Sequence, residues 1–406
     1  MSRSRRRAAH ARERCSADGD KPVRLLGGGL YVHVPFCASK CPYCAFASEV
    51  RPERMEAWVA AVLREASGQT GRWGTFDTLY LGGGTPSVLP PTQLERLLLG
   101  LRRFFRFARG CEATLEANPG DVDRERAGAW RALGFNRLSL GVQSFSDPEL
   151  VFLGRRHDAR TARRALAIAR DAGFFNLGVD LLYGWRDQEP QTLRRTLVEV
   201  ARFAPEHVSC YQLTIEEGTP FFCRNETQPL VAPEEEQAER FLRVSEFLGS
   251  RGFEHYEVSN FARGRRYRSR HNQKYWRRLP TLGLGPAAHS FDGSRRWWNF
   301  RSLARYLDAV GATGEGREGE ETLDRRQARD ERILLGLRTR DGVALSSLSL
   351  SARKRAFSAF VPQGLLEARR GRLRPTPRGM LLADRLALEL SQDASPDERR
   401  GGGQRS

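Results

Sequence analysis

The feature that most constrains the fold of this chain is an alternation of strand and helix that repeats six times. Short segments rich in apolar and β-branched residues recur between residues 29 and 216, and the segments between them show helical periodicity. Such alternation implies parallel strands joined by right-handed crossovers, which build either an incomplete barrel or a doubly wound sheet. The six predicted strands are GLYVHVPF (29–36), DTLYLGG (77–83), EATLEANP (112–119), NRLSLGVQSF (136–145), NLGVDLLYG (176–184) and HVSCYQLTIE (207–216).

The residues at the ends of these segments favour the barrel. Nearly every predicted strand carries its polar or glycine residues at its C-terminal end. An α/β barrel keeps its active site at the C-terminal ends of its strands, whereas a doubly wound sheet concentrates such residues beside one switch point. We therefore predict an α/β fold with a partial, six-unit (β/α) barrel of the TIM type. The residues concerned are Cys37, the glycines 82–84, Glu116, Gln143, Asp180 and Thr214.

The pattern changes after about residue 226. Residues 233–252 predict one amphipathic helix, residues 262–278 are basic and aromatic, and the glycine-rich residues 311–320 predict a linker. Beyond them, the order helix, helix, short hairpin, helix predicts a winged-helix-like α+β cap. The predicted domains are a disordered basic tail (1–27), the barrel core (28–260), the basic and aromatic extension with the linker (261–320), the cap (321–392) and a disordered tail (393–406).

The net charge of +18 bears on the partners of the protein. Only four of the 67 basic residues are Lys, a skew that GC-rich coding alone produces. The alternative is an anionic partner, and the charge does not choose between nucleic acid, lipid head groups and a carboxylated ligand.

Composition also bears on location. No run of apolar residues is long enough to span a bilayer, and the Arg-rich first 26 residues lack the apolar stretch of a secretory signal. The seven cysteines are odd in number, which favours a compartment where thiols stay reduced. We predict a cytoplasmic protein, with an organelle transit peptide as the alternative for the N-terminal segment.

Three of those cysteines, Cys37, Cys41 and Cys44, have the spacing C-x3-C-x2-C directly after the first strand. A disulfide pair would leave one of them over, and structural zinc takes four protein ligands. The nearest fourth ligand is His33, which lies inside the strand and faces the same way as Tyr31. A four-iron cluster normally takes four thiolates, so three cysteines leave one iron open to a small molecule. The spacing therefore favours an iron–sulfur cluster, with zinc as the alternative.

The motif resembles that of the radical S-adenosylmethionine (SAM) superfamily, in which an aromatic residue, here Tyr43, precedes the third cysteine at the head of a six-unit barrel. The resemblance implies a [4Fe-4S] cluster whose open iron chelates the amino and carboxylate groups of SAM. Electron transfer into the sulfonium then gives a 5′-deoxyadenosyl radical. The resemblance also implies that GGGTP (82–86) cradles the SAM amino group. The SAM-binding residues implied are Tyr31, Tyr43, Gly83, Gly84, Thr85, Glu116, Gln143, Arg155 and Asp180, and the cluster ligands implied are Cys37, Cys41 and Cys44.

The resemblance narrows to the group that holds the oxygen-independent coproporphyrinogen III dehydrogenases and the heme chaperones of the HemW type. It rests on strings that run in family order from about residue 29 to about residue 390. The dehydrogenases typically have a fourth cysteine at the position of Phe46 and a longer N-terminal segment, so both features favour the chaperones. Matching strings include YVHVPFC, CPYCAF, LYLGGGTPS, LEANPGD, LSLGVQSF, VDLLYG and LGLGPAAHS, and the chaperone string H-N-x-x-Y-W appears as His271, Asn272, Tyr275 and Trp276.

The chaperone interpretation implies heme or a porphyrin as ligand and heme-accepting proteins such as respiratory cytochromes as partners. It also implies that coproporphyrinogen dehydrogenase activity is lacking. His271 is the predicted heme ligand, because it lies beside aromatic and Arg residues that suit the ring and the propionates of heme. The alternative is that His271 packs a loop. The basic surface also suits peripheral contact with a membrane.

Two other functions remain open. As a coproporphyrinogen III dehydrogenase, the oxygen-independent oxidase of porphyrin biosynthesis, the protein would convert propionates to vinyl groups with the same SAM site. As a nucleic-acid modifier, it would contact phosphates and stack bases with residues 262–278. The nucleic-acid hypothesis is the weakest of the three, because the RNA-binding domain of the RNA-modifying relatives is not visible in the sequence.

Overall fold

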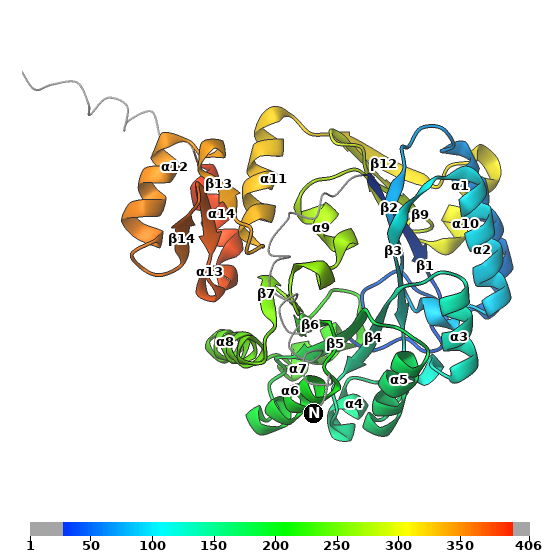
Figure 1. The fold of residues 1–406 in the computed structure, drawn as a ribbon, viewed down its shortest axis with the longest axis horizontal. Coiled ribbons are helices and arrows are strands. Elements are labelled where there is room, and N and C mark those ends of the chain that lie inside the picture. Colours follow the sequence, from blue (N-terminus) through cyan, green and yellow to red (C-terminus); the bar gives the residue numbers. More distant parts are fainter. Residues whose placement is uncertain (1–26, 393–406) are drawn as a thin grey trace, which may run out of the picture.

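The six predicted strands form a continuous run in the sheet of the computed structural model, which describes residues 27–392 (Figure 1). Each strand pairs in parallel with the next along the chain. The predicted tails (1–27 and 393–406) lie outside the described residues, apart from Gly27. The strands are β1 (Gly28–Val34), β2 (Phe76–Gly83), β3 (Phe107–Ala117), β4 (Arg137–Gln143), β5 (Leu177–Tyr183) and β6 (His207–Gln212).

The barrel that these strands form remains open. Among the strands that the structure describes, β1 has β9 (Thr281–Leu284) as its second neighbour and β6 has β8 (Asn260–Ala262), so β1 and β6 do not meet. The fold is therefore the predicted α/β partial barrel, extended at both edges into a sheet of twelve strands. The other added strands are β7 (Glu254–Glu257), β10 (His289–Phe291), β11 (Arg295–Asn299) and β12 (Arg317–Thr322).

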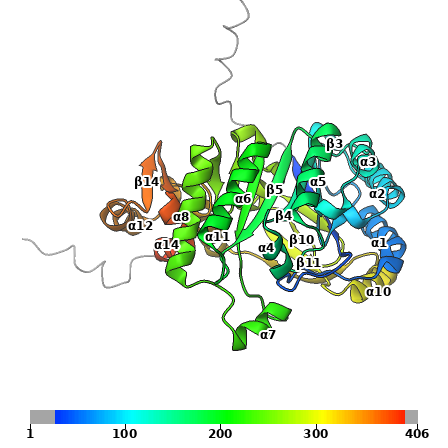
Figure 2. The same cartoon turned by 90° about the horizontal axis from the view of Figure 1, so that it is seen from below.

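The alternation of side chains along the strands decides which face of the sheet the helices cover. In β1, Leu30, Val32 and Val34 are completely buried in the core that the outer helices share. Tyr31 and His33 alternate with them and point into the barrel. Figure 2 shows the helices as an outer layer around the strands. These helices are α1 (Met55–Gly68), α2 (Pro91–Phe104), α3 (Arg124–Ala132), α5 (Ala159–Asp171), α6 (Pro190–Phe203) and α8 (Glu234–Ser250).

Local sequence signals start several of these helices. Asp158 caps α5, because its carboxylate accepts a hydrogen bond from Thr161 N (2.7 Å). Asp123 caps α3 in the same way, accepting from Arg126 N (2.8 Å). Within residues 27–392, no helix has both the length and the apolar character needed to cross a bilayer.

The linker prediction for residues 311–320 is wrong. These residues contain the end of α10 (Leu303–Thr313) and the first part of β12, which pairs antiparallel with β11. Two of the four glycines that suggest a linker serve close packing instead: a Cβ on Gly316 would clash with the Tyr306 ring, and a Cβ on Gly319 would lie 2.6 Å from the Trp298 ring. Cross-strand pairs of Arg and Glu also tie β11 to β12. Composition alone does not show this pairing, because it depends on a partner strand.

The C-terminal cap has the predicted winged-helix-like arrangement. It is built around its own hydrophobic core, and its three strands form a separate small sheet in the order β13, β15, β14. The elements of the cap are α11 (Arg325–Leu337), β13 (Val343–Ala344), α12 (Leu350–Arg355), β14 (Leu366–Arg369), β15 (Arg372–Pro375), α13 (Pro377–Leu381) and α14 (Ala383–Ser391).

Backbone hydrogen bonds join the cap to the core beside β7. Val258 N donates to Arg338 O (3.0 Å), and Arg340 N donates to Tyr256 O (2.9 Å). Ion pairs between the cap and arginines of residues 268–278 add to these contacts. These contacts form a polar seam, and α13 of the cap also contacts α8 of the core.

Candidate cofactor site at the barrel mouth

The loop after β1 carries the three predicted cluster ligands at the C-terminal end of the barrel. Its first residues are fixed by apolar packing, since Phe36 is 1% exposed and stands edge-on to Trp58 of α1. The backbone doubles back on itself: Cys37 N donates to Glu49 O (3.0 Å), and Glu49 N donates to Pro35 O (2.7 Å). These bonds close the loop at its base.

Two other parts of the fold hold the same loop. Phe221 N, at the start of α7 (Pro220–Thr227), donates to Pro42 O (3.0 Å). His33 Nε2 of β1 donates to Ala47 O (2.8 Å). The conformation of the cysteine loop therefore rests on contacts within the protein.

Both ring nitrogens of His33 take part in hydrogen bonds. Because Nε2 donates to Ala47, Nδ1 is the acceptor for the Tyr31 hydroxyl (3.1 Å). Burial lowers the pKa of His33 to about 4, so the ring is neutral at physiological pH. The expectation that His33 is held inside the strand is confirmed.

The three thiols lie in one region of the loop. Thr85 Oγ1 donates to Sγ of Cys37 (3.4 Å), and Arg155 Nη1 donates to Sγ of Cys41 (3.2 Å). Burial raises the pKa of Cys44, and the charges of Cys37 and Cys41 raise it further. The three sulfur atoms are thus near enough to influence one another.

The donor set fits an iron–sulfur cluster. Between residues 27 and 392, no three His, Cys, Asp or Glu side chains are grouped closely enough to bind one metal ion. An iron–sulfur cluster does not require its thiolates to converge on one metal ion, because each thiolate binds a separate iron. Thiolates without imidazole or carboxylate are also the soft donors that such clusters take. Cys37, Cys41 and Cys44 are therefore suited to hold three irons of a cluster.

Glycine is required where the loop after β2 meets the cysteine loop. Gly84 N donates to Val34 O (2.8 Å), which brings the two backbones together. Gly83 has a φ of +110°, and a Cβ there would lie 2.6 Å from the ring of His33. A Cβ on Gly84 would lie 2.7 Å from Phe36 O, so both glycines are needed because the protein itself occupies the space of a side chain.

Glu116 of β3 lies inside the barrel beside this glycine loop. It accepts hydrogen bonds from the Tyr80 hydroxyl (2.6 Å) and from Gly83 N (3.2 Å). Burial is the main cause that raises the pKa of Glu116 to about 7, and the charge of Asp180 acts in the same direction. The carboxyl group is consequently about half ionised at neutral pH.

Asp180 of β5 faces the same interior. Ser139 of β4 donates to its two carboxylate oxygens (3.0 and 3.2 Å), and Ser209 of β6 also forms a hydrogen bond with it. Burial raises the pKa of Asp180 despite these bonds. Strands β2 to β6 thus bring two carboxyl groups and their hydroxyl partners to the inner face of the barrel.

Gln143 and Arg155 contain polar atoms that lack a partner among the described residues. Gln143 ends β4 with a φ of +67°, and its buried Oε1 has no hydrogen bond. Arg155 Nη2 donates to Gly141 O (2.9 Å) and Nη1 lies 3.4 Å from the Tyr43 hydroxyl, but Nε has no partner. Leaving buried polar atoms unsatisfied is costly, so these two atoms indicate a polar ligand.

The chemistry of these groups fits SAM. The carboxylate of SAM needs a donor such as Arg155, while its ammonium and ribose hydroxyls need acceptors such as Gln143 and Glu116. The structure brings these predicted residues together with the cysteine loop at one end of the barrel. The same holds for Tyr43, which packs against Phe221.

Sequence reasoning missed four polar residues of the interior: Tyr80, Ser139, Ser209 and Tyr211. Tyr211 of β6 is 41% exposed even though burial raises its pKa well above the ordinary value. A side chain that is deep in the protein and yet accessible lines open space inside the barrel. The alternation of side chains along a strand could have identified Tyr80 as an inward-facing residue, because Tyr80 lies between the apolar Leu79 and Leu81.

His271 lies away from the cysteine loop. It belongs to α9 (Arg270–Trp276), and its Nδ1 lies 2.9 Å from Thr78 Oγ1, near the N-terminal end of β2. Its Nε2 lies 3.0 Å from the Tyr275 hydroxyl. The side chain is 1% exposed, and burial lowers its pKa to about 3. Of the predicted SAM residues, Tyr31 is the one whose ring lies beside it (6.2 Å between centroids).

Buried polar contacts anchor α9 under the barrel. Lys274 is completely buried, and its Nζ lies 2.5 Å from Asp77 Oδ1 and donates to Gly27 O (2.9 Å). Glu112 Oε1 of β3 accepts a hydrogen bond from Arg270 N (2.8 Å) at the start of the helix. The short helix thus closes the end of the barrel opposite to the cysteine loop.

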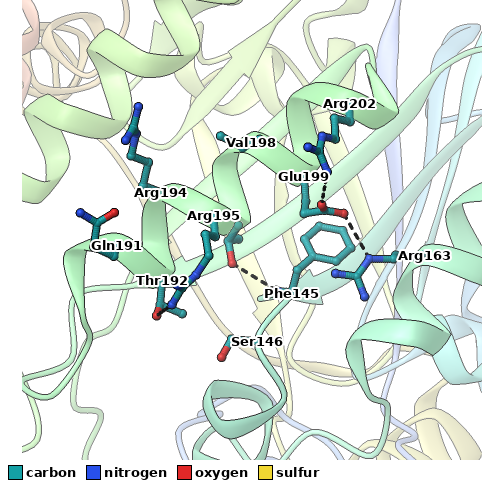
Figure 3. Close-up of a pocket in the computed structure, with 11 residues that line it drawn as sticks. Phe145, Ser146, Arg163, Gln191, Thr192, Arg194, Arg195, Val198, Glu199 and Arg202 are labelled. Atoms are coloured by element: carbon teal, nitrogen blue, oxygen red, sulfur yellow. Dashed lines mark hydrogen bonds and ion pairs between the residues drawn. The ribbon is translucent and has the colours of Figure 1, made fainter.

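A separate cavity of about 490 Å³ lies on the outer surface beside α5 and α6 (Figure 3). Two of its arginines are already paired, because Glu199 accepts from Arg163 (3.1 Å) and from Arg202 (2.9 Å). Arg195 donates to Thr192 Oγ1 (2.7 Å). None of the predicted cofactor residues lines this outer cavity.

An open six-strand barrel whose mouth carries a three-cysteine loop, a glycine loop and buried carboxyl groups defines a radical SAM protein. The family model for the Radical SAM superfamily matches residues 31–200, and the model for the HemN C-terminal domain matches residues 323–382. A heme chaperone HemW from Mycobacterium tuberculosis is 35% identical over 89% of this chain and 94% of its own length. The chain belongs to the HemW family of radical SAM proteins.

Other relatives agree with this assignment. The radical S-adenosyl methionine domain-containing protein 1, mitochondrial, of Bos taurus is 33% identical over 89% of this chain and 86% of its own length. Among solved structures, coproporphyrinogen III oxidase (HemN) from Escherichia coli, a radical SAM enzyme, has a TM-score of 0.78 at 24% identity and 90% coverage of both chains. That likeness shows that the two proteins share a fold.

Proposed function

We propose that this protein is a cytoplasmic heme chaperone that binds a [4Fe-4S] cluster, SAM and heme. It delivers the heme to recipient proteins such as respiratory cytochromes and lacks coproporphyrinogen dehydrogenase activity. The observation that carries the proposal lies in the cysteine loop, where Phe46 stands at the position of the additional cysteine of the dehydrogenases and is 64% exposed. Relatives that are called heme chaperones, with 31–36% identity, support it.

The residues at the barrel mouth would hold the two small cofactors. The three thiols would bind the cluster, and the backbone of the glycine loop would meet the SAM amino group. Arg155 would donate Nε to the SAM carboxylate, and Gln143 would accept a hydrogen bond through Oε1. Bound together, cluster and SAM supply the one-electron cleavage chemistry of the superfamily. The role of this chain is to position SAM and to shield it within the barrel.

His271 is the proposed ligand of the heme iron. Iron binds a neutral imidazole, and the lowered pKa of His271 keeps the ring neutral above about pH 3. Its Nδ1 is engaged by Thr78 in the barrel wall, so the iron would approach Nε2. That approach requires Tyr275, the present partner of Nε2, to move aside. Tyr275 is 38% exposed, which gives its ring accessible space.

An anaerobic hemin titration of the cluster-loaded protein, followed by absorbance, tests the proposal. We expect one saturable, stoichiometric spectrum in the wild type and an altered spectrum in His271→Ala. The matched control is His289→Ala, which removes an exposed histidine of β10 and should leave the spectrum unchanged. Absence of saturable hemin binding in the wild type would refute the chaperone function.

A second assay separates the chaperone from the dehydrogenase. The same preparation is incubated with coproporphyrinogen III, SAM and a low-potential reductant, and the products are analysed for vinyl groups. We expect no decarboxylated product. Its formation in repeated turnovers would contradict the proposal and assign the protein to the dehydrogenases.

A further inference from the structure

A second cavity, of about 530 Å³, is lined by residues of the core and of the cap. Figure 1 shows that α9 and α11, which both contribute to it, lie next to each other. Gln273 and Trp276 of α9 and the following Arg277 line one side of it, and none of the three is among the α9 residues that enter the barrel. The opposite wall comes from α11, from residues 339–347 and from β15. Its volume is within the usual range of small-molecule sites. We call it the junction cavity.

The lining of the junction cavity is strongly basic. It includes six arginines and a single acidic residue, Asp341. That carboxylate is already shared between Arg268 (3.3 Å) and Arg277 (2.7 Å). Among the described residues, Arg332, Arg372 and Arg374 have no ion pair with a carboxylate, and Arg372 donates instead to the backbone carbonyls of Asp341 and Gly342 (2.7 Å each). In the outer cavity of Figure 3, by contrast, Glu199 pairs with two arginines.

Two donors of residues that line the junction cavity lack an acceptor among the residues that the structure describes. The indole Nε1 of Trp276 and the guanidinium Nε of Arg374 are buried and make no hydrogen bond. Arg and Trp side chains are donors only, so the missing partner must be an acceptor. Buried donors without a partner raise the free energy of the empty site.

The geometry of these groups suits an oxyanion. The planar fork of Arg matches carboxylate and phosphate groups, and hydrogen bonds to a charged acceptor are the stronger kind. Trp276, which is only partly buried, adds aromatic surface to the lining. The cavity is thus equipped for an anionic group that is attached to a flat, apolar body.

We propose that the junction cavity receives the carboxylate groups of the porphyrin ligand. The proposal rests on the proposed heme-chaperone function, but it does not depend on which side chain binds the iron. It assigns recognition of the propionates to residues of both the extension and the cap, with Arg374 and Trp276 as direct donors.

Parallel titrations of the cluster-loaded, full-length protein with hemin and with hemin dimethyl ester test the proposal. The ester keeps the ring and the iron but has no anionic carboxylates. We expect hemin to bind about tenfold more tightly than the ester, as one or two charge-assisted bonds imply. Arg374→Gln and Trp276→Phe should each weaken hemin binding severalfold and leave binding of the ester unchanged.

Arg194→Gln is the matched control, because Arg194 is an exposed arginine of the outer cavity. We expect hemin and ester affinities as in the wild type, and thermal unfolding followed by circular dichroism verifies that every variant is folded. A third arm repeats the hemin titration in the presence of inorganic pyrophosphate, which should compete only at concentrations far above those of hemin.

The outcomes separate this proposal from the function on which it rests. If hemin binds but the ester binds equally well, or if the Arg374 and Trp276 variants behave as the control, the carboxylate site is refuted and the chaperone function stands. If hemin does not bind at all, both fail. If pyrophosphate displaces hemin at equal concentration, the cavity is a phosphate site and the porphyrin assignment is refuted.

Discussion

One guanidinium group, that of Arg155, connects three parts of the barrel mouth. It contacts Sγ of Cys41, the hydroxyl of Tyr43 and the carbonyl of Gly141. An Arg suits this place better than a Lys, because its planar fork offers five donors in fixed directions. Its Nε still lacks a partner among the described residues, so a ligand carboxylate would complete the set.

We expect Arg155→Lys to weaken SAM binding by about tenfold or more, because a single ammonium group does not replace these contacts. Anaerobic isothermal titration of the cluster-loaded protein measures the affinity. Arg156→Lys is the control, since the neighbouring Arg156 pairs with Asp121 instead. Equal SAM affinity in both variants would contradict the role of Arg155.

The pKa of Glu116 gives the unfolding free energy a pH dependence. It is about 7 in the folded protein, against an ordinary value of 4.5, so the folded state binds more protons than the unfolded state between these values. The contribution of Glu116 to stability therefore falls as the pH rises through this range. The loss is complete above about pH 7.

Glu116→Gln removes this titration. We expect the difference in unfolding free energy, variant minus wild type, to rise by up to about 3 kcal/mol from pH 5 to pH 8. Urea unfolding of the cluster-free protein at both pH values measures the difference. Glu125→Gln, which changes an exposed carboxylate of α3, should show no such gain. A pH-independent difference between Glu116→Gln and the wild type would show that Glu116 titrates normally.

At the residue scale, the sequence predicted the groups that belong to local motifs. The cysteines, the glycine loop and Arg155 follow from strings that can be read along the chain. Tyr80 was missed because its contact with Glu116 joins residues 36 positions apart through the register of β2 and β3. The partner of His271, Thr78, lies 193 positions away and is still less accessible to sequence reasoning.

At the scale of the element, α9 is a seven-residue helix whose stability comes from tertiary contacts. Lys274 provides one of them, as a fully buried charge paired with Asp77. Removing one member of a buried pair leaves the other without compensation. The position of α9 therefore depends on this ion pair.

We expect Lys274→Met to lower the unfolding free energy by about 3 kcal/mol, because Asp77 then keeps only the contact with Arg270 (3.3 Å). Chemical denaturation measures this change. Lys354→Met on α12 replaces an exposed lysine and should change stability by less than about 0.5 kcal/mol. A similar effect of both substitutions would contradict the structural role of the ion pair.

Gly83 of the glycine loop and Gly110 of β3 both have a positive φ, and comparing them separates backbone strain from steric clash. Gly83 has a φ of +110° and no room for a Cβ beside His33, whereas Gly110 has a φ of +74° and nothing within 4 Å of a Cβ. We expect Gly110→Ala to cost about 1 kcal/mol from backbone strain alone and Gly83→Ala to cost about 3 kcal/mol or more. Thermal unfolding measures both. Equal costs would show that the loop relaxes around the added methyl group.

The strand–helix alternation predicted the six central strands, but not all of their ends. β3 starts at Phe107, five residues before the predicted start, because Phe107 pairs with Phe76 at the beginning of β2. β6 ends at Gln212, so Thr214 lies beyond the strand, exposed, and donates to Glu216. The short antiparallel strands that extend the sheet carry too few residues for a period to be visible.

At the scale of the whole molecule, the seam between core and cap is polar rather than apolar. Asp341 of the cap lies between Arg268 and Arg277 of the extension, and these arginines outweigh burial and lower its pKa. A polar seam of this kind is held together by a few hydrogen bonds and ion pairs. It is therefore sensitive to the loss of a single charge.

We expect Asp341→Asn to loosen the cap without unfolding the barrel, because the substitution removes the charge shared by two arginines and costs about 1–3 kcal/mol at the seam. Hydrogen exchange measures this loosening of the cap. The backbone amides of residues 254–258 and 338–341, which lie along the seam, should exchange faster than in the wild type. Asp384→Asn is the control, since that side chain is 78% exposed beside Arg338. Unchanged exchange at the seam in Asp341→Asn would contradict this account.

The base of the cysteine loop is closed by backbone bonds between Cys37, Glu49 and Pro35, and Phe221 and His33 hold its middle. None of these bonds passes through a cofactor, unlike the contacts of small domains that collapse when their metal is removed. On the proposed function, these contacts would keep the loop in place if oxidation destroyed the cluster. New iron and sulfide could then rebuild the cluster without refolding of the loop.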